Sequence, residues 1–480
     1  MIYDVIIIGA GVVGCAVARE LSRSKGAMLV IERSEDVCTG TSKANSAIIH
    51  SGYDAENGTW KAKLNVRGNR MMDTLSKELS IPFFRIGSLT VCTQEERLGE
   101  LEQLRERGER NGVEGLSVLS RDEALRIEPH LADDVVGALY APTAGIVCPF
   151  RMTAAFAENA AENGVEFRFG EEVQHIARDG ELWRIETDRE VYHTRAVVNA
   201  AGVYADVLNN MVSSHQLCIT PRRGDYLLLD TTVEGYVTHT VFQLPTTMGK
   251  GVLVSPTVHG NTIVGPTAFE TDDREQTATT EEGIAQVILK QSNSIKDLPI
   301  GQVITSFSGL RASEQGHDFV LGEPDDAPGF FNCAGIESPG LSASPAIAEM
   351  IAQQIREKYT LKEKQDFIAQ QRDIVHMKPL SYEEQAKKIA QNPAYGVIVC
   401  RCAGVTEGEI IDAIRAPLGA RTLDGIKRRT GSQMGRCQGG FCTPKIMDIM
   451  TRELGIGMED IRKNGPGSHL VTARTKGGDE

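Results

Sequence analysis

The sequence predicts a chain of three parts: an α/β dinucleotide-binding domain, an α+β domain built on an antiparallel sheet, and a small helical domain at the C-terminus. Three observations indicate this class. A β-branched run followed by three closely spaced glycines opens the chain, a stretch rich in threonine, valine and turn residues fills its middle, and four cysteines lie within 43 residues near its end. A chain of 480 residues is long enough for about three domains of ordinary size.

The composition is typical of a folded protein that stays in water. Apolar residues make up 41% of the chain and charged residues 24%, which excludes wholesale disorder. Acidic residues outnumber basic ones by 65 to 51, a formal charge of −14, so we expect no attraction to nucleic acid or anionic membranes. No apolar run is long enough for a membrane span, and the apolar start lacks the basic leader of a secretory signal. We therefore expect a cytoplasmic protein.

The first elements of the chain form a βαβ unit. Residues 2–8 are a short β-branched run without polar alternation, which is typical of a strand buried on both faces of a parallel sheet. A helix over residues 15–24 and a second apolar strand over residues 27–31 follow. This order of elements is a complete βαβ opening.

Three glycines between the first strand and the helix predict the binding of a dinucleotide. Gly9 allows the tight turn, Gly11 lets the backbone approach a pyrophosphate, and Gly14 lets the helix pack closely on the strand. The N-terminus of the helix adds free N–H groups and the positive end of its dipole. Glu32 ends the second strand, where it can accept hydrogen bonds from ribose hydroxyls. If the glycines served packing alone, Glu32 would have no role.

Two later strands end in turns of small residues, one over residues 196–202 and the other over residues 329–335. The second leads into a helix over about residues 344–359, with Pro345 suited to its first turn. Between these strands, residues 215–310 are rich in threonine, valine and turn residues. This composition predicts antiparallel strands.

The dinucleotide signature does not by itself distinguish a flavin from a nicotinamide cofactor. An irregular stretch over residues 38–52 follows the βαβ unit, and residues 332–345 send a second strand and helix toward the same site. One dinucleotide held by both ends of a chain resembles flavoproteins of the D-amino-acid-oxidase-like superfamily. The resemblance covers roughly residues 1–355 and also rests on the turn at 199–202 and the motif at 308–311.

This resemblance implies a discontinuous, Rossmann-like FAD-binding domain and an antiparallel substrate domain. The FAD-binding domain is then expected over residues 1–85, 145–214 and 305–359, and the substrate domain over residues 86–144 and 215–304. The helix near residue 344 would point its N-terminus at the flavin ring and stabilise the charge of reduced flavin; the alternative is an ordinary capped helix. The expected FAD contacts are Gly9, Gly11, Gly14, Glu32, Gly202, Gly335, Gly340, Leu341 and Ser342.

The resemblance also implies two catalytic residues. Arg311 stands where the superfamily has an arginine for the anionic group of the substrate, and its fork can pair with two oxygens at once. His50 lies in the loop that passes beside the flavin in similar enzymes, and its neutral imidazole suits removal of a hydroxyl proton while a hydride leaves for the flavin. A surface salt bridge and a structural histidine are the ordinary alternatives. Further candidates are Arg222, Arg223, Lys250, Tyr53 and Tyr226.

Within the superfamily, the segments at 45–52, 60–64, 87–91 and 144–147 look like those of enzymes that act on 2-hydroxy anions. Residues 261–267 look closer to the L-2-hydroxyglutarate dehydrogenases. The C-terminal extension looks closer to the anaerobic glycerol-3-phosphate dehydrogenases. We therefore expect oxidation of sn-glycerol 3-phosphate to dihydroxyacetone phosphate, with L-2-hydroxyglutarate as the alternative substrate.

Four cysteines near the C-terminus form two pairs, Cys400 with Cys402 and Cys437 with Cys442. Four thiolates can hold either a [2Fe–2S] cluster or a tetrahedral zinc ion. Zinc sites favour spacers of two to four residues, and the single residue between Cys400 and Cys402 is short for that pattern. The arrangement closely resembles the bacterioferritin-associated-ferredoxin-like [2Fe–2S] domain, a small helical unit, which implies that all four cysteines are cluster ligands.

Two predicted helix starts support this small domain. Thr406 and Glu409 form a capping box, and Thr443 opens a helix whose N-terminus would face the Cys442 thiolate. The expected boundaries are a linker with a polar connecting helix over 360–395, the four-cysteine domain over 396–460 and a mobile tail over 461–480.

A cluster beside a flavin implies that electrons leave the chain. The resemblance therefore implies a dehydrogenase with a small anionic hydroxy substrate and an electron-accepting protein as partner, such as a second flavoprotein subunit. The alternative from a different functional class is a redox sensor or electron carrier that has no substrate. A scaffold protein with a structural zinc site is a third possibility.

Overall fold

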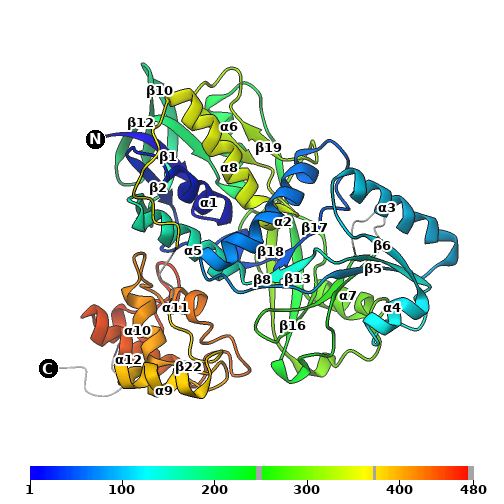
Figure 1. The fold of residues 1–480 in the computed structure, drawn as a ribbon. Coiled ribbons are helices and arrows are strands. Elements are labelled where there is room, and N and C mark those ends of the chain that lie inside the picture. The colour runs from blue at the N-terminus through cyan, green and yellow to red at the C-terminus, as the bar shows by residue number, and fades with distance from the viewer. Residues whose placement is uncertain (245–250, 371–373, 474–480) are drawn as a thin grey trace.

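The computed structural model describes residues 1–244, 251–370 and 374–473. The chain folds into a dinucleotide domain, a substrate domain and a C-terminal four-cysteine domain (Figure 1). The four-cysteine domain lies beside helix α5 (Pro149–Glu162) of the dinucleotide domain, where it is in contact with α11 (Leu423–Thr430). No helix of the described ranges is long and apolar enough to cross a membrane.

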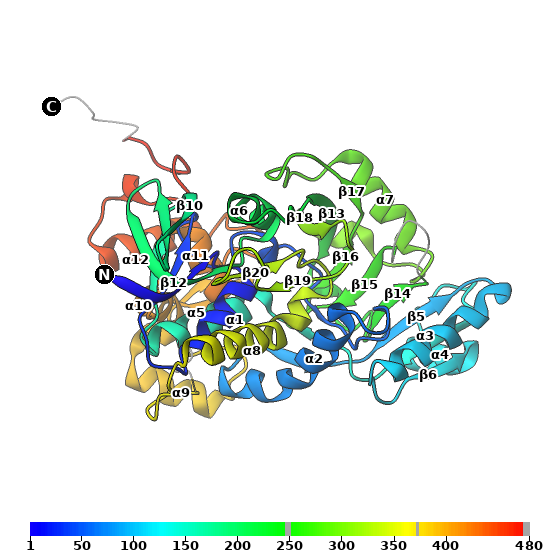
Figure 2. The same cartoon turned by 90° about the horizontal axis from the view of Figure 1, so that it is seen from above.

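A mixed sheet forms the centre of the dinucleotide domain, with strands in the order β10-β11-β12-β1-β2-β9. Strands β12, β1, β2 and β9 run parallel, and β20 extends the parallel part by pairing with β12. Helices α1, α5 and α8 cover one face (Figure 2). The elements of this domain are β1 (Ile2–Ile8), α1 (Val12–Leu21), β2 (Met28–Glu32), α2 (Trp60–Glu78), α5 (Pro149–Glu162), β9 (Glu166–Phe169), β10 (Val173–Asp179), β11 (Leu182–Thr187), β12 (Val191–Asn199), α6 (Ala205–Val212), β19 (Val320–Gly322), β20 (Phe330–Ala334) and α8 (Gly340–Tyr359).

Strand β1 has no polar alternation because both of its faces are buried. Val5 and Ile7 point into the core below helices α1 and α8, whereas Ile6 and Ile8 join the core on the opposite face. Trp183 of β11 belongs to that second core. The predicted double burial of this strand is confirmed.

The substrate domain is built on a second sheet, in the order β17-β13-β16-β15-β14-β5-β7-β6, with β18 also pairing with β13. Its strands are antiparallel, as expected, except for the parallel pair of β5 and β14. Its elements are β5 (Ser88–Cys92), α3 (Leu98–Arg110), β6 (Ser117–Ser120), α4 (Arg121–Ile127), β7 (Gly137–Ala141), β13 (Ile219–Leu229), β14 (Thr240–Gln243), β15 (Leu253–Pro256), β16 (Thr262–Gly265), β17 (Phe269–Glu270), α7 (Glu281–Gln291) and β18 (Val303–Glu314). A small separate sheet joins β3 (Ile48–Ile49), β4 (Phe83–Arg85) and β8 (Gly145–Val147).

Two expected boundaries differ from the structure. Strand β18 pairs with β13 from Ile219↔Glu314 to Leu229↔Val303, so residues 305–314 lie in the substrate sheet and not in the FAD-binding domain. Helix α8 begins at Gly340, one turn before the predicted start near residue 344. Pro345 therefore lies inside the helix, and the Leu341 carbonyl that it leaves without a backbone partner accepts a hydrogen bond from Ser344 Oγ at 3.0 Å.

The four-cysteine domain is helical, as predicted, and its core is separate from the others. The capping box of Thr406 and Glu409 is formed, and Cys442 is the N-cap of the helix that Thr443 opens. Its elements, with the linker helix, are α9 (Tyr382–Gln391), β21 (Ile398–Cys400), β22 (Val405–Thr406), α10 (Glu407–Arg415), α11 (Leu423–Thr430) and α12 (Thr443–Leu454).

The expected mobile tail lies partly in the structure. Arg462 accepts a hydrogen bond from Leu423 N through its carbonyl and forms an ion pair with Glu35 of the dinucleotide domain. Residues 461–473 are described, and these contacts attach the first part of the tail to the protein. Residues 474–480 lie outside the described residues.

Candidate functional site

A cavity of about 1250 Å³ lies between the dinucleotide domain and the sheet of the substrate domain. The ends of strands β1 and β2 reach it through Gly9 and Glu32, and the turn after β12 reaches it through Gly202. Because the carboxyl ends of parallel strands share one edge of a sheet, these residues come together from distant parts of the sequence. Gly340 and Leu341 bring the N-terminus of α8 to the same cavity.

The glycine turn has the geometry that a dinucleotide requires. Gly9 has a φ of +104° and a side chain there would lie 2.5 Å from the Ala200 carbonyl oxygen. A Cβ at Gly14 would lie 2.0 Å from the Gly9 carbonyl oxygen, so Gly14 holds α1 close to β1 and does not line the cavity. Beside Gly11, the Val12 N–H at the start of α1 donates to Ser42 Oγ at 2.9 Å.

Glu32 stands at the end of β2, where the sequence places it. Its Oε2 accepts from Ala10 N at 2.7 Å, and its Oε1 accepts from Ser34 N at 2.9 Å. A carboxylate has about four acceptor sites, so these two bonds fix the group and leave it able to accept from ribose hydroxyls. Glu32 also lines the cavity.

Besides Gly14, two more of the predicted FAD contacts, Gly335 and Ser342, do not line the cavity. Ser342 Oγ accepts from His50 N at 2.8 Å and lies 3.3 Å from the Ile48 carbonyl oxygen, to which it donates. It therefore ties α8 to the loop that carries His50. Gly335, with a φ of +63°, makes the turn after β20.

His50 lines the cavity, and its backbone is held on both sides. Ser342 accepts from its N–H, and Asn69 Nδ2 donates to its carbonyl at 3.0 Å. The His50 ring lies 5.6 Å from that of Phe242, between centroids. The loop is thus fixed at the cavity wall, and the catalytic role of His50 stays a prediction.

Arg311 lies opposite Arg222 in the pairing of β18 with β13, and both line the cavity. Residues directly opposite each other on antiparallel strands project from the same face of the sheet. Arg311 Nη2 donates to the Thr267 carbonyl at 3.2 Å, and Arg222 Nε is buried without a hydrogen-bond partner among the described residues. Gly224 makes room for the pair, because a Cβ there would lie 2.8 Å from Arg311 Nη2.

Two like charges facing each other across a strand pair are destabilising. An anion held between the two guanidiniums would satisfy both, as forked hydrogen bonds to carboxylate or phosphate do. This end of the cavity therefore concentrates positive charge, to which Arg222 contributes together with the predicted Arg311.

The other candidate residues have different positions. Arg223 does not line the cavity; it lies 3.4 Å from Asp225 Oδ1 and donates to Thr280 Oγ1 at 3.0 Å. Tyr226 and Tyr53 do line it. Burial raises the pKa of Tyr53, so this hydroxyl, 2.7 Å from Thr90 Oγ1, stays protonated. Lys250 lies outside the described residues.

The four predicted cluster ligands come together as two pairs of thiols. Cys402 Sγ lies 3.7 Å from Cys437 Sγ, and Cys400 is hydrogen-bonded to Cys442. That bond and backbone N–H groups lower the pKa of Cys400 to about 6. Backbone N–H groups, chiefly that of Phe441, also lower the pKa of Cys437. Such donors stabilise thiolate, the form that ligates metal.

The paired arrangement fits a [2Fe–2S] cluster, which takes four cysteine thiolates over two irons. A zinc ion would need its ligands around one point. Within the part of the chain that the structure describes, no group of three or more histidine, cysteine or carboxylate side chains is placed to hold a single metal ion.

Some cavity residues were not predicted from the sequence. Ser46 Oγ lies 3.3 Å from Tyr226 OH, and Ser42 Oγ accepts a hydrogen bond from the first turn of α1. Both lie in the irregular stretch over residues 38–52, whose polar composition was the available signal. Arg428 lines the same cavity from the four-cysteine domain, and nothing in its local sequence points to this position.

Two family models match the chain. The model described as FAD dependent oxidoreductase matches residues 4–354, and the model described as BFD-like [2Fe-2S] binding domain matches residues 398–452. These are the parts that hold the dinucleotide turn and the four cysteines. The cofactors of the chain are thus FAD and a [2Fe–2S] cluster.

Individual proteins with known names are also similar to the chain. It is 46% identical over 475 residues to the glycerol 3-phosphate dehydrogenase of Caloramator mitchellensis, with 99% of each chain covered. It is 30% identical to the mitochondrial L-2-hydroxyglutarate dehydrogenase of Arabidopsis thaliana, covering 73% of this chain and 82% of the relative. The solved structure of dithionite-reduced L-alpha-glycerophosphate oxidase from Mycoplasma pneumoniae with FAD bound is 31% identical, with a TM-score of 0.74, and covers 77% of this chain and 98% of its own.

The matches agree with the geometry of the molecule. The FAD model spans well over half of the chain, and its range contains the glycine turn, Glu32, His50 and Arg311. The second model contains all four paired cysteines. The protein therefore belongs to the family of FAD-dependent oxidoreductases and carries a BFD-like [2Fe–2S] binding domain.

Proposed function

We propose that the protein is a dehydrogenase that oxidises sn-glycerol 3-phosphate to dihydroxyacetone phosphate and passes the electrons to a second protein. The observation that carries this proposal is the pair of cavity-lining arginines, Arg222 and Arg311, which face each other. Neither forms an ion pair with a carboxylate among the described residues, although β17 places Glu270 opposite Arg222 on its other side. Two guanidiniums match the two charges of a phosphate monoester. The relative from Caloramator mitchellensis, similar over 99% of both chains, is named for this substrate.

We assign a role in the reaction to three of the residues that line the cavity. Arg222 and Arg311 hold the phosphate and thereby fix the position of the carbon chain. His50, in a loop tied down by Ser342 and Asn69, accepts the proton of the substrate hydroxyl as the C–H bond is broken. FAD, when bound, supplies the acceptor for two electrons, and the cluster supplies an outlet for single electrons.

The exposed surface beside the four cysteines supports an electron-accepting protein as partner. Cys402 is exposed, and Phe441, in the loop between Cys437 and Cys442, is 82% exposed. An apolar side chain beside a metal site is open to contact with another protein. A second flavoprotein subunit is the partner that we propose.

L-2-Hydroxyglutarate is the second candidate substrate, because the relative from Arabidopsis thaliana is named for it and arginines also bind carboxylates. A substrate-free electron carrier is less well supported, since it would have no use for paired arginines in the cavity.

Steady-state oxidation of three compounds tests the substrate proposal. The holoenzyme is assayed with sn-glycerol 3-phosphate, L-2-hydroxyglutarate and glycerol, with a dye as electron acceptor. We expect kcat/KM to be at least a hundredfold higher for glycerol 3-phosphate than for the other two, because glycerol lacks the anion and the dicarboxylate places its charges differently. A higher kcat/KM for L-2-hydroxyglutarate would replace the proposed substrate, and no turnover of any compound would favour the carrier.

A further inference from the structure

The four-cysteine domain is docked on the dinucleotide domain by a buried ion network. Arg429, 2% exposed, donates to both oxygens of Asp36 at 2.8 and 3.0 Å and to Glu158 Oε1 at 3.1 Å. Arg428 Nη2 donates to Asp36 Oδ2 at 2.6 Å. Asp36 lies just beyond β2, in the segment that passes from Glu32 along the cavity. The two domains are thus joined at the edge of the dinucleotide site.

This docking makes the four-cysteine domain one wall of the cavity. Thr422, Asp424 and Arg428 of that domain, with residues 464–466, line the same cavity as Gly11 and the start of α1. The model of the FAD dependent oxidoreductases ends at residue 354. The wall is therefore an addition to the site that the family shares.

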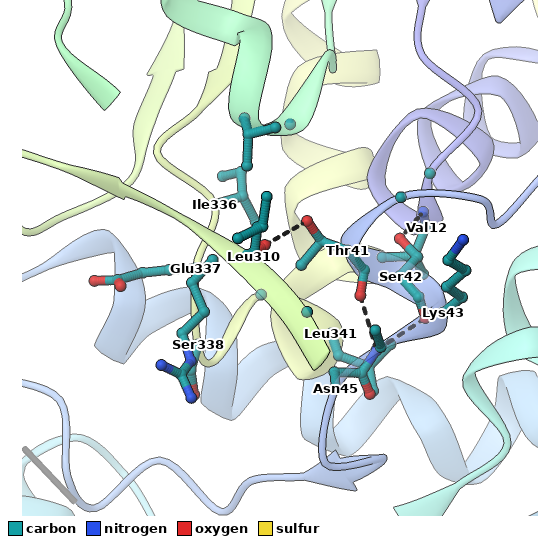
Figure 3. A pocket seen from close by; sticks show the side chains of 18 of the residues that line it. Val12, Thr41, Ser42, Lys43, Asn45, Leu310, Ile336, Glu337, Ser338 and Leu341 are labelled. Carbon is teal, nitrogen blue, oxygen red and sulfur yellow. Dashed lines mark hydrogen bonds between the residues drawn. The ribbon is translucent and has the colours of Figure 1, made fainter. Parts of the chain in front are cut away.

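Two cations at this wall have N–H groups that no described residue accepts from. The Lys43 side chain makes no hydrogen bond or ion pair with any residue that the structure describes, whereas its backbone N–H donates to the Gly40 carbonyl. Figure 3 shows this side chain beside Ser42, close to Val12. Burial and the nearby Arg428 lower the pKa of Lys43. Arg428 is 8% exposed, and its Nε is buried without a hydrogen-bond partner among the described residues.

The neighbouring charges do not cancel these cations. Asp36 is shared between Arg428 and Arg429, and Asp424 is bound to Lys463 Nζ at 3.0 and 3.2 Å. The cavity wall thus presents a surplus of positive charge next to the first turn of α1, where a helix N-terminus favours phosphate.

We propose that Arg428 and Lys43 bind the diphosphate half of FAD from the side of the four-cysteine domain, so that docking of this domain closes the FAD site. The Asp36–Arg429–Glu158 network is the clamp that keeps Arg428 in place. Retention of FAD then depends on the attached [2Fe–2S] domain, and the two cofactor sites form one assembly.

FAD binding to the full chain tests this proposal without any turnover. Apo-protein that retains its cluster is titrated with FAD by flavin fluorescence, and ADP is used as a competitor. We expect Arg428→Gln and Lys43→Gln each to raise the dissociation constants of FAD and ADP by tenfold or more, with iron and sulfide content unchanged. Arg429→Gln, which removes the clamp, should weaken the binding of FAD and of ADP as well.

Arg415→Gln is the matched control, because Arg415 is an exposed arginine of the same domain. Its side chain is 69% exposed and, among the residues that the structure describes, is paired only with Glu453. Its FAD affinity should equal that of the wild type. If Arg428→Gln does not fold, Lys43→Gln decides, since Lys43 lies in the dinucleotide domain. FAD affinities of the folded variants within twofold of the wild type would overturn the proposal, whatever the substrate proves to be.

Discussion

The anion end of the cavity depends on a contact between two residues, Arg222 and Arg311, that are 89 positions apart in the sequence. The antiparallel register of β13 and β18 sets them side by side, and Gly224 leaves the room that the Arg311 guanidinium needs. Each side chain offers a charge-assisted contact, worth about 1.5–3 kcal/mol. Recognition of the phosphate is expected to be shared between them.

Replacing one of these arginines should weaken substrate binding more than turnover. We expect Arg222→Gln to raise KM for glycerol 3-phosphate by about ten- to a hundredfold, because it removes one charge-assisted contact, with a smaller change in kcat. Steady-state kinetics measure both. Arg70→Gln, at an exposed ion pair with Glu114, is the control and should change neither. An unchanged KM for Arg222→Gln would remove Arg222 from the anion site.

His50 carries the proton step of the proposed reaction. We expect His50→Gln to lower kcat by about 10²–10⁴-fold, the usual contribution of a general base, while KM changes little because the phosphate contacts remain. The wild type should gain activity as pH rises through the ionisation of the base, and the variant should lose that dependence. A variant with near-normal kcat, or with the same pH profile, would exclude His50 as the base.

Asp36 makes the docking of the four-cysteine domain sensitive to acid. Burial alone would raise its pKa, but the Arg429 and Arg428 guanidiniums prevail and lower it to about 2. Because the folded pKa lies below the ordinary value, the ionised group adds stability that is complete above about pH 4 and is lost as pH falls toward 2. The shift corresponds to about 2 kcal/mol.

This linkage can be measured as the free energy of unfolding against pH. Asp36→Asn should be less stable than the wild type at pH 6, and the difference should shrink steadily between pH 4 and pH 2. A difference that stays constant over this range would mean that the charge of Asp36 does not hold the domains together.

Sequence reasoning identified the residues whose local pattern has a chemical meaning. Gly9, Gly11, Glu32, His50 and Arg311 all line one cavity, and their roles in binding and catalysis stay predictions. Arg222 was only one of several candidates, because its pairing depends on strand register. Arg428 could not be predicted, because its role at the cavity depends on how two domains meet.

At the scale of elements, the close packing of α1 on β1 is the feature that a single substitution tests most directly. Gly14→Ala places a Cβ where the Gly9 carbonyl oxygen lies only 2.0 Å away, so the helix must move away from the strand. We expect a loss of roughly 1–3 kcal/mol in the free energy of unfolding, as for other overpacked sites, together with weaker FAD binding.

Gly99→Ala is the matched control for this substitution. Gly99 lies in helix α3, and a Cβ there meets nothing within 4 Å. Alanine favours a helix over glycine, so this variant should be as stable as the wild type or slightly more so. If Gly14→Ala behaves in the same way, the close packing of α1 is not what the glycine provides.

Most elements could be predicted from the sequence, but some of their ends could not. The apolar pattern located β1 and the capping box located α10. The start of α8 was missed because Pro345 normally marks a first turn, whereas here Ser344 Oγ satisfies the carbonyl that the proline leaves free. Strand β18 was divided between domains because its long pairing with β13 is a tertiary contact.

At the scale of the whole molecule, the position of the four-cysteine domain is the property least visible in the sequence. The domain itself was predicted from its cysteine spacing, yet its docking rests on four charged residues from distant segments. These residues are Asp36, Glu158, Arg428 and Arg429. Charged residues are common on surfaces, so only the fold distinguishes these buried ones.

In the proposed reaction, electrons taken from the substrate at the FAD site reach the cluster in the same chain. The most direct measurement is the visible spectrum of the anaerobic holoenzyme during stepwise addition of sn-glycerol 3-phosphate. We predict that the absorbance of both the flavin and the cluster falls, and that a Cys402→Ser variant without its cluster shows only the change of the flavin. Bleaching of the flavin in the wild type with no change in cluster absorbance would contradict the account.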